Sequence, residues 1–368
     1  MVQLGTPLDE LDTPCLVVDL DRMDRNIQCW QAAVDATGAR LRPHVKTHKV
    51  PALAHIQLKA GAAGITVAKL GEAEVFAAHG CDDIFVAYPV IGLQKWRRAA
   101  ELARTITLIV GVESEVGARG LSAAAVAAGS TVRVRVEVDL GLARSGVQPA
   151  DLAALASLVH DLQGIELDGI FTFRSTGYAG AGERTIAEIG REEGERMAAL
   201  AEELRTAGLP IRSVSAGSTP TALEAARMLG ITEVRPGTYI FGDYMLAGRG
   251  VIPYADVALS ILCTVVSRPS AGTATIDGGS KTFCGDSIPR GPLQGYARAA
   301  EMEAYVERMS EEHGVVRLPP GADPRVGDRL AFYPIHVCTA VNLADELIGI
   351  RGGRVEQVWP ILARGKRT

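Results

Sequence analysis

The sequence predicts an α/β protein in which a (β/α)₈ barrel is followed by a mainly antiparallel β domain. Strand-like runs rich in Val, Ile and Phe alternate with Ala-, Leu-, Glu- and Arg-rich stretches of helical spacing, and eight such runs lie between residues 41 and 241. From about residue 255 the pattern changes to strand-like runs joined by Gly, Pro and Asp turns, which predicts the second domain.

The eight runs of the predicted barrel follow one another at regular intervals. They cover residues 41–46, 64–69, 83–89, 107–112, 132–139, 167–173, 211–217 and 233–241. Helical stretches such as 70–80, 93–103, 151–162 and 195–208 lie between them, and glycines 61, 80, 164 and 208 stand where helix C-caps are expected. A doubly wound sheet would alternate in the same way. Eight strands of similar length favour a closed, TIM-like barrel, and no G-x-G-x-x-G or P-loop motif points to the open sheet.

The second domain is expected to contain strands at residues 257–267, 272–279, 325–338 and 346–361. A helix over Ala299–Glu312 is the one helical interruption that we expect there. Residues 14–20 form a further strand, which precedes the barrel and is expected to cross over to this sheet. The predicted domains are therefore a barrel over residues 22–250 and a β-rich domain made of residues 1–21 together with 251–368.

Composition excludes several classes of protein. The 368 residues include 38 Lys and Arg against 43 Asp and Glu, a net charge of −5, which argues against nucleic acid or an anionic membrane as the main partner. No apolar run reaches the roughly 18 residues that span a bilayer, and the N-terminal stretch lacks the apolar core of a signal peptide. Six scattered cysteines form no Cys-x-x-Cys motif. We therefore expect a cytoplasmic protein.

The first candidate for chemistry is the segment 43–49, at the end of the first barrel strand, because functional groups of barrels gather at the carboxyl ends of strands. Strand alternation would place His44, Lys46 and His48 on one face. A lysine in a barrel mouth can serve as a Schiff-base nucleophile, whereas a solvated turn is the plainer interpretation. A metal-binding pair of His44 and His48 would require a helix, which Pro43 disfavours.

Small, hydroxyl-bearing turns follow the seventh and eighth strands. They contain Gly217, Ser218, Thr219, Gly237, Thr238 and Tyr239. Backbone N–H groups and hydroxyls at such turns can bind a phosphate, and barrels commonly do so at this pair of loops. One such turn alone would be read as a helix N-cap. Arg144 follows the fifth strand, near the same barrel mouth or as an ordinary surface residue.

His336 and Cys338 form a third candidate, in the β-rich domain. On a strand, residues i and i+2 face the same way, so an imidazole and a thiolate could share one metal ion, with Zn²⁺ the most suitable. A packed strand with an incidental histidine is the alternative interpretation.

A phosphate-binding turn, a barrel lysine and a nearby arginine together suggest pyridoxal phosphate (PLP) as cofactor. The segment 42–49, RPHVKTHK, resembles the cofactor-lysine motif of the D-threonine aldolase/D-serine dehydratase family, whose members are alanine-racemase-like, fold type III PLP enzymes. The resemblance covers nearly the whole chain, through residues 12–14, 139–146, 215–220, 235–239, 277–281 and 336–338. It implies an N-terminal barrel and a C-terminal β domain.

The resemblance also implies roles for individual residues. Lys46 would be the Schiff-base lysine and Arg144 the partner of the pyridine nitrogen, and the two hydroxyl-bearing turns would hold the phosphate. His336 and Cys338 would bind a divalent metal at the substrate's β-hydroxyl; Zn²⁺ is the first expectation, with Mn²⁺ or Mg²⁺ as alternatives. A homodimer and a small D-amino acid substrate are implied as well.

The chain departs from the family pattern at two places. Cys338 stands where aldolases of the family usually carry Asp, and Cys is typical of the dehydratase branch. Family members also place a His after the sixth strand, whereas this chain has no His between residues 161 and 312. The sequence therefore predicts a PLP- and metal-dependent lyase of D-threonine aldolase type acting on a D-3-hydroxy amino acid. The alternatives are a D-serine or D-threo-3-hydroxyaspartate dehydratase, a metal-independent racemase and a non-catalytic PLP carrier.

Overall fold

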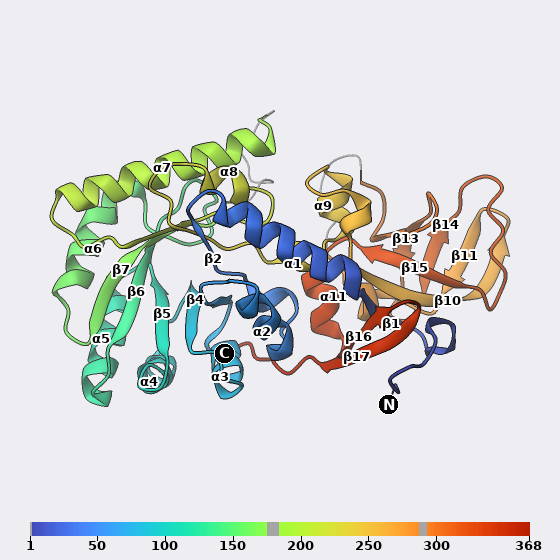
Figure 1. Cartoon of the computed structure of the whole chain (residues 1–368), viewed down its shortest axis with the longest axis horizontal. Coiled ribbons are helices and arrows are strands. Elements are labelled where there is room, and N and C mark those ends of the chain that lie inside the picture. Colours follow the sequence, from blue (N-terminus) through green and yellow to red (C-terminus); the bar gives the residue numbers. More distant parts are fainter. Residues whose placement is uncertain (1, 175–183, 287–292) are drawn as a thin grey trace. The chain divides into compact units, whose positions relative to one another are not determined.

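The computed structural model describes residues 2–174, 184–286 and 293–368, and these fall into two compact units (Figure 1). The barrel unit consists of Cys29–Lys46, Pro51–Gly237 and Gly365–Thr368. The β unit consists of Met1–Gln28, Thr47–Val50 and Thr238–Arg364. The chain therefore passes between the units several times, and the segment of the candidate lysine is one of these crossings.

In the barrel unit, the described residues form one parallel sheet of eight strands. In spatial order these are β2 (Arg40–Leu41), β9 (Glu233–Val234), β8 (Ser213–Ala216), β7 (Ile165–Phe171), β6 (Val132–Glu137), β5 (Thr107–Val112), β4 (Asp83–Pro89) and β3 (Ile65–Val67). Two backbone hydrogen bonds join the outer strands, since Ala63 N donates to Leu41 O at 2.9 Å and Thr66 N donates to Pro43 O at 2.8 Å. The predicted closed (β/α)₈ barrel is confirmed.

Helices surround the strands of the barrel unit, as Figure 1 shows. They are α2 (Pro51–Lys59), α3 (Leu70–Ala78), α4 (Leu93–Leu102), α5 (Glu115–Ala128), α6 (Leu152–Asp161), α7 (Ile186–Thr206) and α8 (Ala222–Ala226). Local sequence sets their ends. At the start of α7, Thr185 and Glu188 form a reciprocal capping box, and Gly61, Gly80, Gly164 and Gly208 adopt the positive φ angles expected of residues that end helices.

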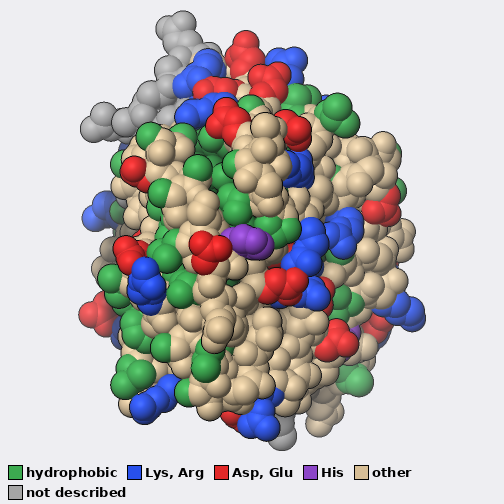
Figure 2. Space-filling model, turned by 90° about the vertical axis from the view of Figure 1, so that its left-hand side faces the viewer, with side chains coloured by type: hydrophobic (Ala, Val, Ile, Leu, Met, Phe, Trp, Pro, Cys, Tyr) green, Lys and Arg blue, Asp and Glu red, His purple; other side chains and the backbone are tan. Residues whose placement is uncertain are grey.

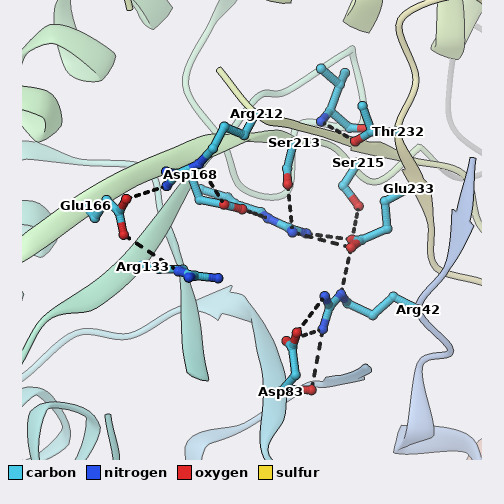
Figure 3. Close-up of polar contacts among 12 residues, drawn as sticks. Arg42, Asp83, Arg133, Glu166, Asp168, Arg212, Ser213, Ser215, Thr232 and Glu233 are labelled. Atoms are coloured by element: carbon cyan, nitrogen blue, oxygen red, sulfur yellow. Dashed lines mark hydrogen bonds and ion pairs between the residues drawn. The ribbon is translucent and has the colours of Figure 1, made fainter. Parts of the chain in front are cut away.

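A network of charged side chains crosses the interior of the barrel (Figure 3). Arg42 donates from Nε to Glu233 at 2.6 Å and from Nη1 to Asp83 at 2.6 Å. Arg135 donates to Glu233 at 2.5 Å and to Asp168 at 2.7 Å. We call these five residues the barrel network. Asp83 and Glu233 are the first residues of their strands, so the network lies toward the amino ends of β4 and β9.

The β unit contains one sheet of nine strands within the described ranges. Their order is β11 (Thr273–Ile276), β14 (Gly314–Arg317), β13 (Tyr305–Met309), β12 (Ala297–Ala299), β15 (Arg329–Pro334), β10 (Leu259–Ser270), β1 (Cys15–Asp19), β16 (Glu346–Arg351) and β17 (Arg354–Pro360). A further pairing of β11 with β10 closes the first six into a ring. The expected crossover is confirmed, because β1 pairs with both β10 and β16.

Short helices accompany this sheet. They are α9 (Tyr244–Gly248), α10 (Ser280–Phe283) and α11 (Val337–Leu343), while α1 (Leu20–Asp35) begins in the β unit. The helix expected over Ala299–Glu312 is wrong. Residues of β13 pair there with β14, with Val306 opposite Val316, so cross-strand burial overrides the helical composition of the segment.

Charges of both signs are mixed on the surface of the barrel unit. On the face drawn in Figure 2, Lys and Arg side chains lie between Asp and Glu side chains, as the small net charge of −5 leads one to expect. Among the residues that the structure describes, no helix combines the length and the apolar character needed to cross a bilayer.

Candidate functional site

Lys46 lies in the short 3₁₀ helix η2 (Val45–Thr47), close to the end of the first barrel strand. That strand covers only Arg40–Leu41, and His44 adds one isolated bridge. The expected alternation of His44, Lys46 and His48 along an extended strand is therefore wrong. Closure of the barrel holds the backbone as far as His44, whose N–H donates to Pro236 O at 2.9 Å, and the chain coils beyond it.

Two of the predicted residues meet on one aromatic ring of the barrel unit. Lys46 Nζ lies 5.8 Å from the centroid of the Phe173 ring, and Arg144 Cζ lies 4.5 Å from the same centroid. Both distances are in the range of cation–π attraction. Phe173 follows β7, so carboxyl-end segments of three strands contribute to this group, as expected for a barrel mouth.

Arg144 is carried by a loop after β6 that its own backbone and side chains hold together. Asp139 Oδ1 accepts hydrogen bonds from Gly141 N at 2.9 Å and from Leu142 N at 2.8 Å. On the carboxyl-terminal side of the loop, Val147 N donates a hydrogen bond to Glu137 O at 2.9 Å. These hydrogen bonds therefore hold the backbone at Arg144 in place, while its long side chain is exposed.

Two basic residues near this group were not assigned a role from the sequence. His44 Nδ1 is buried and has no hydrogen-bond partner among the described residues. Burial, together with the nearby charges of Lys46 and Arg235, lowers the pKa of His44 well below its usual value, so its imidazole is neutral. The sequence signal that could have identified His44 as a site residue is its position two residues before Lys46.

Arg235 is buried at the end of β9. It donates from Nη1 to Ser215 Oγ at 2.5 Å and from Nη2 to Thr172 O. Burial lowers the pKa of Arg235 to about 10, against the opposing effect of Glu233, and the guanidinium remains charged at neutral pH. A buried guanidinium with fixed neighbours is a rigid cation, in contrast to the exposed Arg144.

The turns predicted to bind phosphate are already tied by side-chain oxygens. Gly217 N donates to Glu193 Oε1 at 2.9 Å, Ser218 N to Thr221 Oγ1 at 3.0 Å, and Gly237 N to Thr219 Oγ1 at 3.2 Å. The structure thus brings Gly217, Ser218, Thr219 and Gly237 together. Thr238 and the buried Tyr239 begin the 3₁₀ helix η4 (Thr238–Ile240), which belongs to the β unit.

The structure also brings the two predicted metal ligands together, in the β unit. His336 occupies the N-cap position of α11 without a capping hydrogen bond from its side chain, and Cys338 lies in the first turn of the helix. The expectation that a strand presents both residues is wrong, because a helix begins between them. Burial lowers the pKa of His336, but the charge of Cys338 and the hydrogen bond with Asp286 outweigh burial and raise this pKa above its usual value. Cys338 Sγ lies 3.2 Å from Thr47 Oγ1, in the same unit, and Thr47 directly follows Lys46 in the chain.

Asp286 supports the metal-ligand pair and was not found from the sequence. Its Oδ2 lies 2.6 Å from His336 Nδ1 and 3.0 Å from Thr339 Oγ1. A carboxylate that binds one imidazole nitrogen leaves the other for a metal ion, which is a common arrangement around metal-bound histidines. Among the residues described, no group of three or more His, Cys, Asp or Glu side chains is placed to hold a metal ion.

Neighbouring residues of the lysine segment have structural contacts. His48 is buried, accepts a hydrogen bond at Nδ1 from Val50 N at 3.0 Å and packs edge-on against Phe241. Lys49 Nζ donates to Asn342 Oδ1 at 2.7 Å. The segment after β7 that lacks the family's His lies outside the described residues at 175–183.

Comparisons with known proteins cover both units. Residues 18–245 match the family described as "Alanine racemase, N-terminal domain", and residues 258–350 match the family described as "Putative serine dehydratase domain". D-threonine aldolase from Arthrobacter sp. is 36% identical over 368 residues, which cover 99% of this chain and 95% of that protein. D-threo-3-hydroxyaspartate dehydratase from Delftia sp. is 38% identical, with 89% of this chain and 91% of the relative covered.

Solved structures agree with these relationships. The crystal structure of D-threonine aldolase from Filomicrobium marinum matches with a TM-score of 0.90 and 32% identity, and the match covers 100% of both chains. The Delftia dehydratase matches with a TM-score of 0.83 and 35% identity over 96% of this chain and 98% of that one. This chain therefore belongs to the D-threonine aldolase/D-serine dehydratase-like family of alanine-racemase-like, PLP-dependent lyases.

Proposed function

We propose that this enzyme is a PLP- and divalent-metal-dependent lyase that cleaves a D-3-hydroxy amino acid to glycine and an aldehyde, as D-threonine aldolases do. The observation that carries the proposal is the His336–Cys338 pair, because a metal held there gives the enzyme a means to act on a hydroxyl group. The backbone links this pair to the cofactor lysine, since Cys338 contacts Thr47 and Thr47 follows Lys46. A cytoplasmic homodimer is part of the same proposal.

The barrel residues fit PLP. Lys46 supplies a primary amine beside an aromatic ring, and Arg144 supplies a guanidinium for the pyridine nitrogen, with the buried Arg235 as a second candidate. The turn at Gly217 admits no side chain, because a Cβ there would lie 2.6 Å from Ala222 Cα. Ser218, Thr219 and Gly237 would complete the phosphate site, together with Thr238 and Tyr239, which follow Gly237 directly in the chain. A phosphate there would replace side-chain oxygens as the acceptor of the N–H groups of Gly217, Ser218 and Gly237. When bound, PLP withdraws electrons from the substrate's Cα, which is what cleavage next to Cα requires.

In this scheme the residues of the chain would bind and orient the cofactor and the metal ion, and would set the charge around them. His44, kept neutral among cations, adds no further positive charge beside the cofactor. His336 and Cys338 would hold the divalent ion, Zn²⁺ by preference for imidazole and thiolate, and Asp286 would orient the imidazole. A divalent ion held by His336 and Cys338 would supply Lewis acidity to the β-hydroxyl group of the substrate. In the overall reaction the hydroxyl proton is lost, the Cα–Cβ bond breaks to give the aldehyde, and Cα gains a proton to give glycine.

A dehydratase is the second candidate, and Cys338 is the observation that favours it. One solved variant of the Delftia dehydratase, in which a cysteine is replaced by alanine, is described as metal-free. In that reaction Cα–H is abstracted and the hydroxyl leaves from Cβ, so the ion would serve the leaving group instead.

Product analysis separates the two candidates. Purified holoenzyme is incubated with D-threonine, D-serine and D-3-hydroxyaspartate, with and without EDTA. Glycine and an aldehyde, formed only without chelator, support the aldolase proposal. Ammonia and a keto acid would replace it by the dehydratase. Appearance of the L-amino acid, or no turnover of any of the three, would overturn both in favour of a racemase or a PLP carrier.

A further inference from the structure

Glu137 is a buried acid at the barrel mouth that the proposed chemistry does not use. It is the last residue of β6 and is 3% exposed. Its Oε1 accepts a hydrogen bond from Ser145 Oγ at 2.8 Å. Its Oε2 is buried and has no hydrogen-bond partner among the residues that the structure describes. Because a buried carboxyl oxygen without a partner is costly, such an atom is expected to serve a nearby cation or a bound molecule.

Two hydrogen bonds join Glu137 to the loop that carries Arg144. Its backbone oxygen accepts from Val147 N at 2.9 Å, and its side chain holds Ser145, the residue next to Arg144. A second acid, Glu113, accepts from Gly146 N at 2.5 Å. Two acidic side chains thus accept hydrogen bonds from residues 145 and 146 and hold the carboxyl-terminal side of the loop.

The positive charges of neighbouring residues are a reason for an acidic residue at position 137. Lys46 and Arg144 share the Phe173 ring, so two cations lie close together at one place in the barrel mouth. Burial raises the pKa of Glu137, while its hydrogen bond from Ser145 and the positive charge of Arg144 oppose that rise. Among the described residues, no ion pair or hydrogen bond joins the carboxyl group of Glu137 directly to the guanidinium of Arg144, so Glu137 acts on this loop through its hydrogen bond from Ser145.

We propose that Glu137 is a positioning residue for Arg144: its carboxyl group holds Ser145, the next residue in the chain, and thereby sets the loop from which the guanidinium reaches the cofactor. The inference rests on the proposed function, because it assumes that Arg144 contacts PLP. It adds a residue to the site that neither the motifs nor the metal chemistry indicate.

The decisive variant is Glu137→Gln, which keeps the shape of the side chain and an oxygen for Ser145 but removes the charge. We expect apoprotein of this variant to bind PLP about tenfold more weakly than wild type, as for the loss of one charge-assisted hydrogen bond. We also expect a shift in the pH at which the visible absorbance of bound PLP changes. Glu137→Asp should show PLP affinity and an absorbance titration between those of Glu137→Gln and wild type. Glu166→Gln, at an exposed acid of β7, is the matched control and should change neither.

The outcomes separate this inference from the proposed function. If wild-type protein forms no borohydride-reducible link between PLP and Lys46, the proposed function fails first. If wild type forms it and Glu137→Gln shows unchanged PLP affinity and an unchanged absorbance titration, the positioning role is overturned, whatever happens to the melting temperature. If Glu137→Gln does not fold, Ser145→Ala replaces it, with a several-fold loss of PLP affinity expected and an unchanged affinity counting against the proposal.

Discussion

The chemistry expected of Lys46 depends on its neighbours as much as on its own amine. The ring of Phe173 and the guanidinium of Arg144 lie beside it, and the neutral imidazole of His44 stands two residues earlier. Lys49, three residues later, donates to Asn342 in the β unit instead. The two lysines of one short motif thus have different surroundings, and this difference can be tested.

Lys46→Ala should abolish the covalent, borohydride-reducible attachment of PLP, while Lys49→Ala should keep it. Reduction of the PLP-loaded proteins followed by mass spectrometry of peptides measures the modified position directly. Attachment at a unique lysine in Lys46→Ala protein would refute the assignment, and Lys49 would then be the first residue to examine.

Gly217 is a second residue where a substitution has a defined effect. Its φ of +78° is strained for any side chain, and a Cβ would approach Ala222 Cα to 2.6 Å. Gly217→Ala should therefore cost about 1–3 kcal/mol of stability and also weaken PLP binding. Gly208→Ala is the matched control, because φ is +86° there but nothing lies within 4 Å of the added carbon. Gly208→Ala should lower the stability without weakening PLP binding. Equal PLP affinity in both variants would place the phosphate elsewhere.

Among the elements, the two short helical segments η2 and α11 carry the candidate lysine and the candidate metal ligands, respectively. Neither was predicted. Periodicity identifies long helices and strands well, but a segment of three to seven residues offers too few positions to distinguish a helical turn from an extended strand. The motifs on these segments were nevertheless found, because residue type and spacing indicate chemistry independently of local conformation.

Removal of the metal tests α11 directly. Chelation with EDTA should abolish turnover while PLP absorbance and the melting temperature stay unchanged, because two protein ligands leave positions for water or substrate, as catalytic sites require. Cys338→Ser should behave like chelated enzyme. Cys29→Ser, at an exposed thiol, is the control. Full activity without metal would discard the lyase mechanism, and unfolding on chelation would mark the metal as structural.

At the scale of the whole molecule, alternation along the chain was enough to predict the barrel, its closure and the β-rich second part. The charged interior was not predictable in this way. Arg42, Asp83, Arg135, Asp168 and Glu233 lie on five different strands or their ends, up to 191 positions apart, and meet only when the barrel closes. Two further contacts could not be predicted from alternation either: that of Glu137 with Ser145 depends on the conformation of the loop between them, and that of Asp286 with His336 joins residues 50 positions apart.

The barrel network yields a prediction for stability against pH. Burial alone would raise the pKa of Glu233, but the guanidiniums of Arg135 and Arg42 outweigh it and hold the pKa well below the usual range. A carboxyl whose folded pKa is depressed stabilises the fold above its unfolded pKa of about 4.3, and this contribution is lost as the pH falls toward the folded value. Neutralising Glu233 also leaves two buried guanidiniums without their shared partner.

Glu233→Gln should therefore destabilise the protein by about 3–5 kcal/mol at pH 7, and the difference from wild type should shrink below about pH 4, because only wild type loses stability there through protonation of Glu233. Urea unfolding at pH 7, 5, 4 and 3.5 measures this difference. Glu166→Gln is the control, since its exposed pair with Arg212 at 2.6 Å contributes under about 1 kcal/mol. A gap between Glu233→Gln and wild type that stays constant from pH 7 to 3.5 would show that shape and hydrogen bonding, rather than the ionised carboxylate, hold the centre of the barrel.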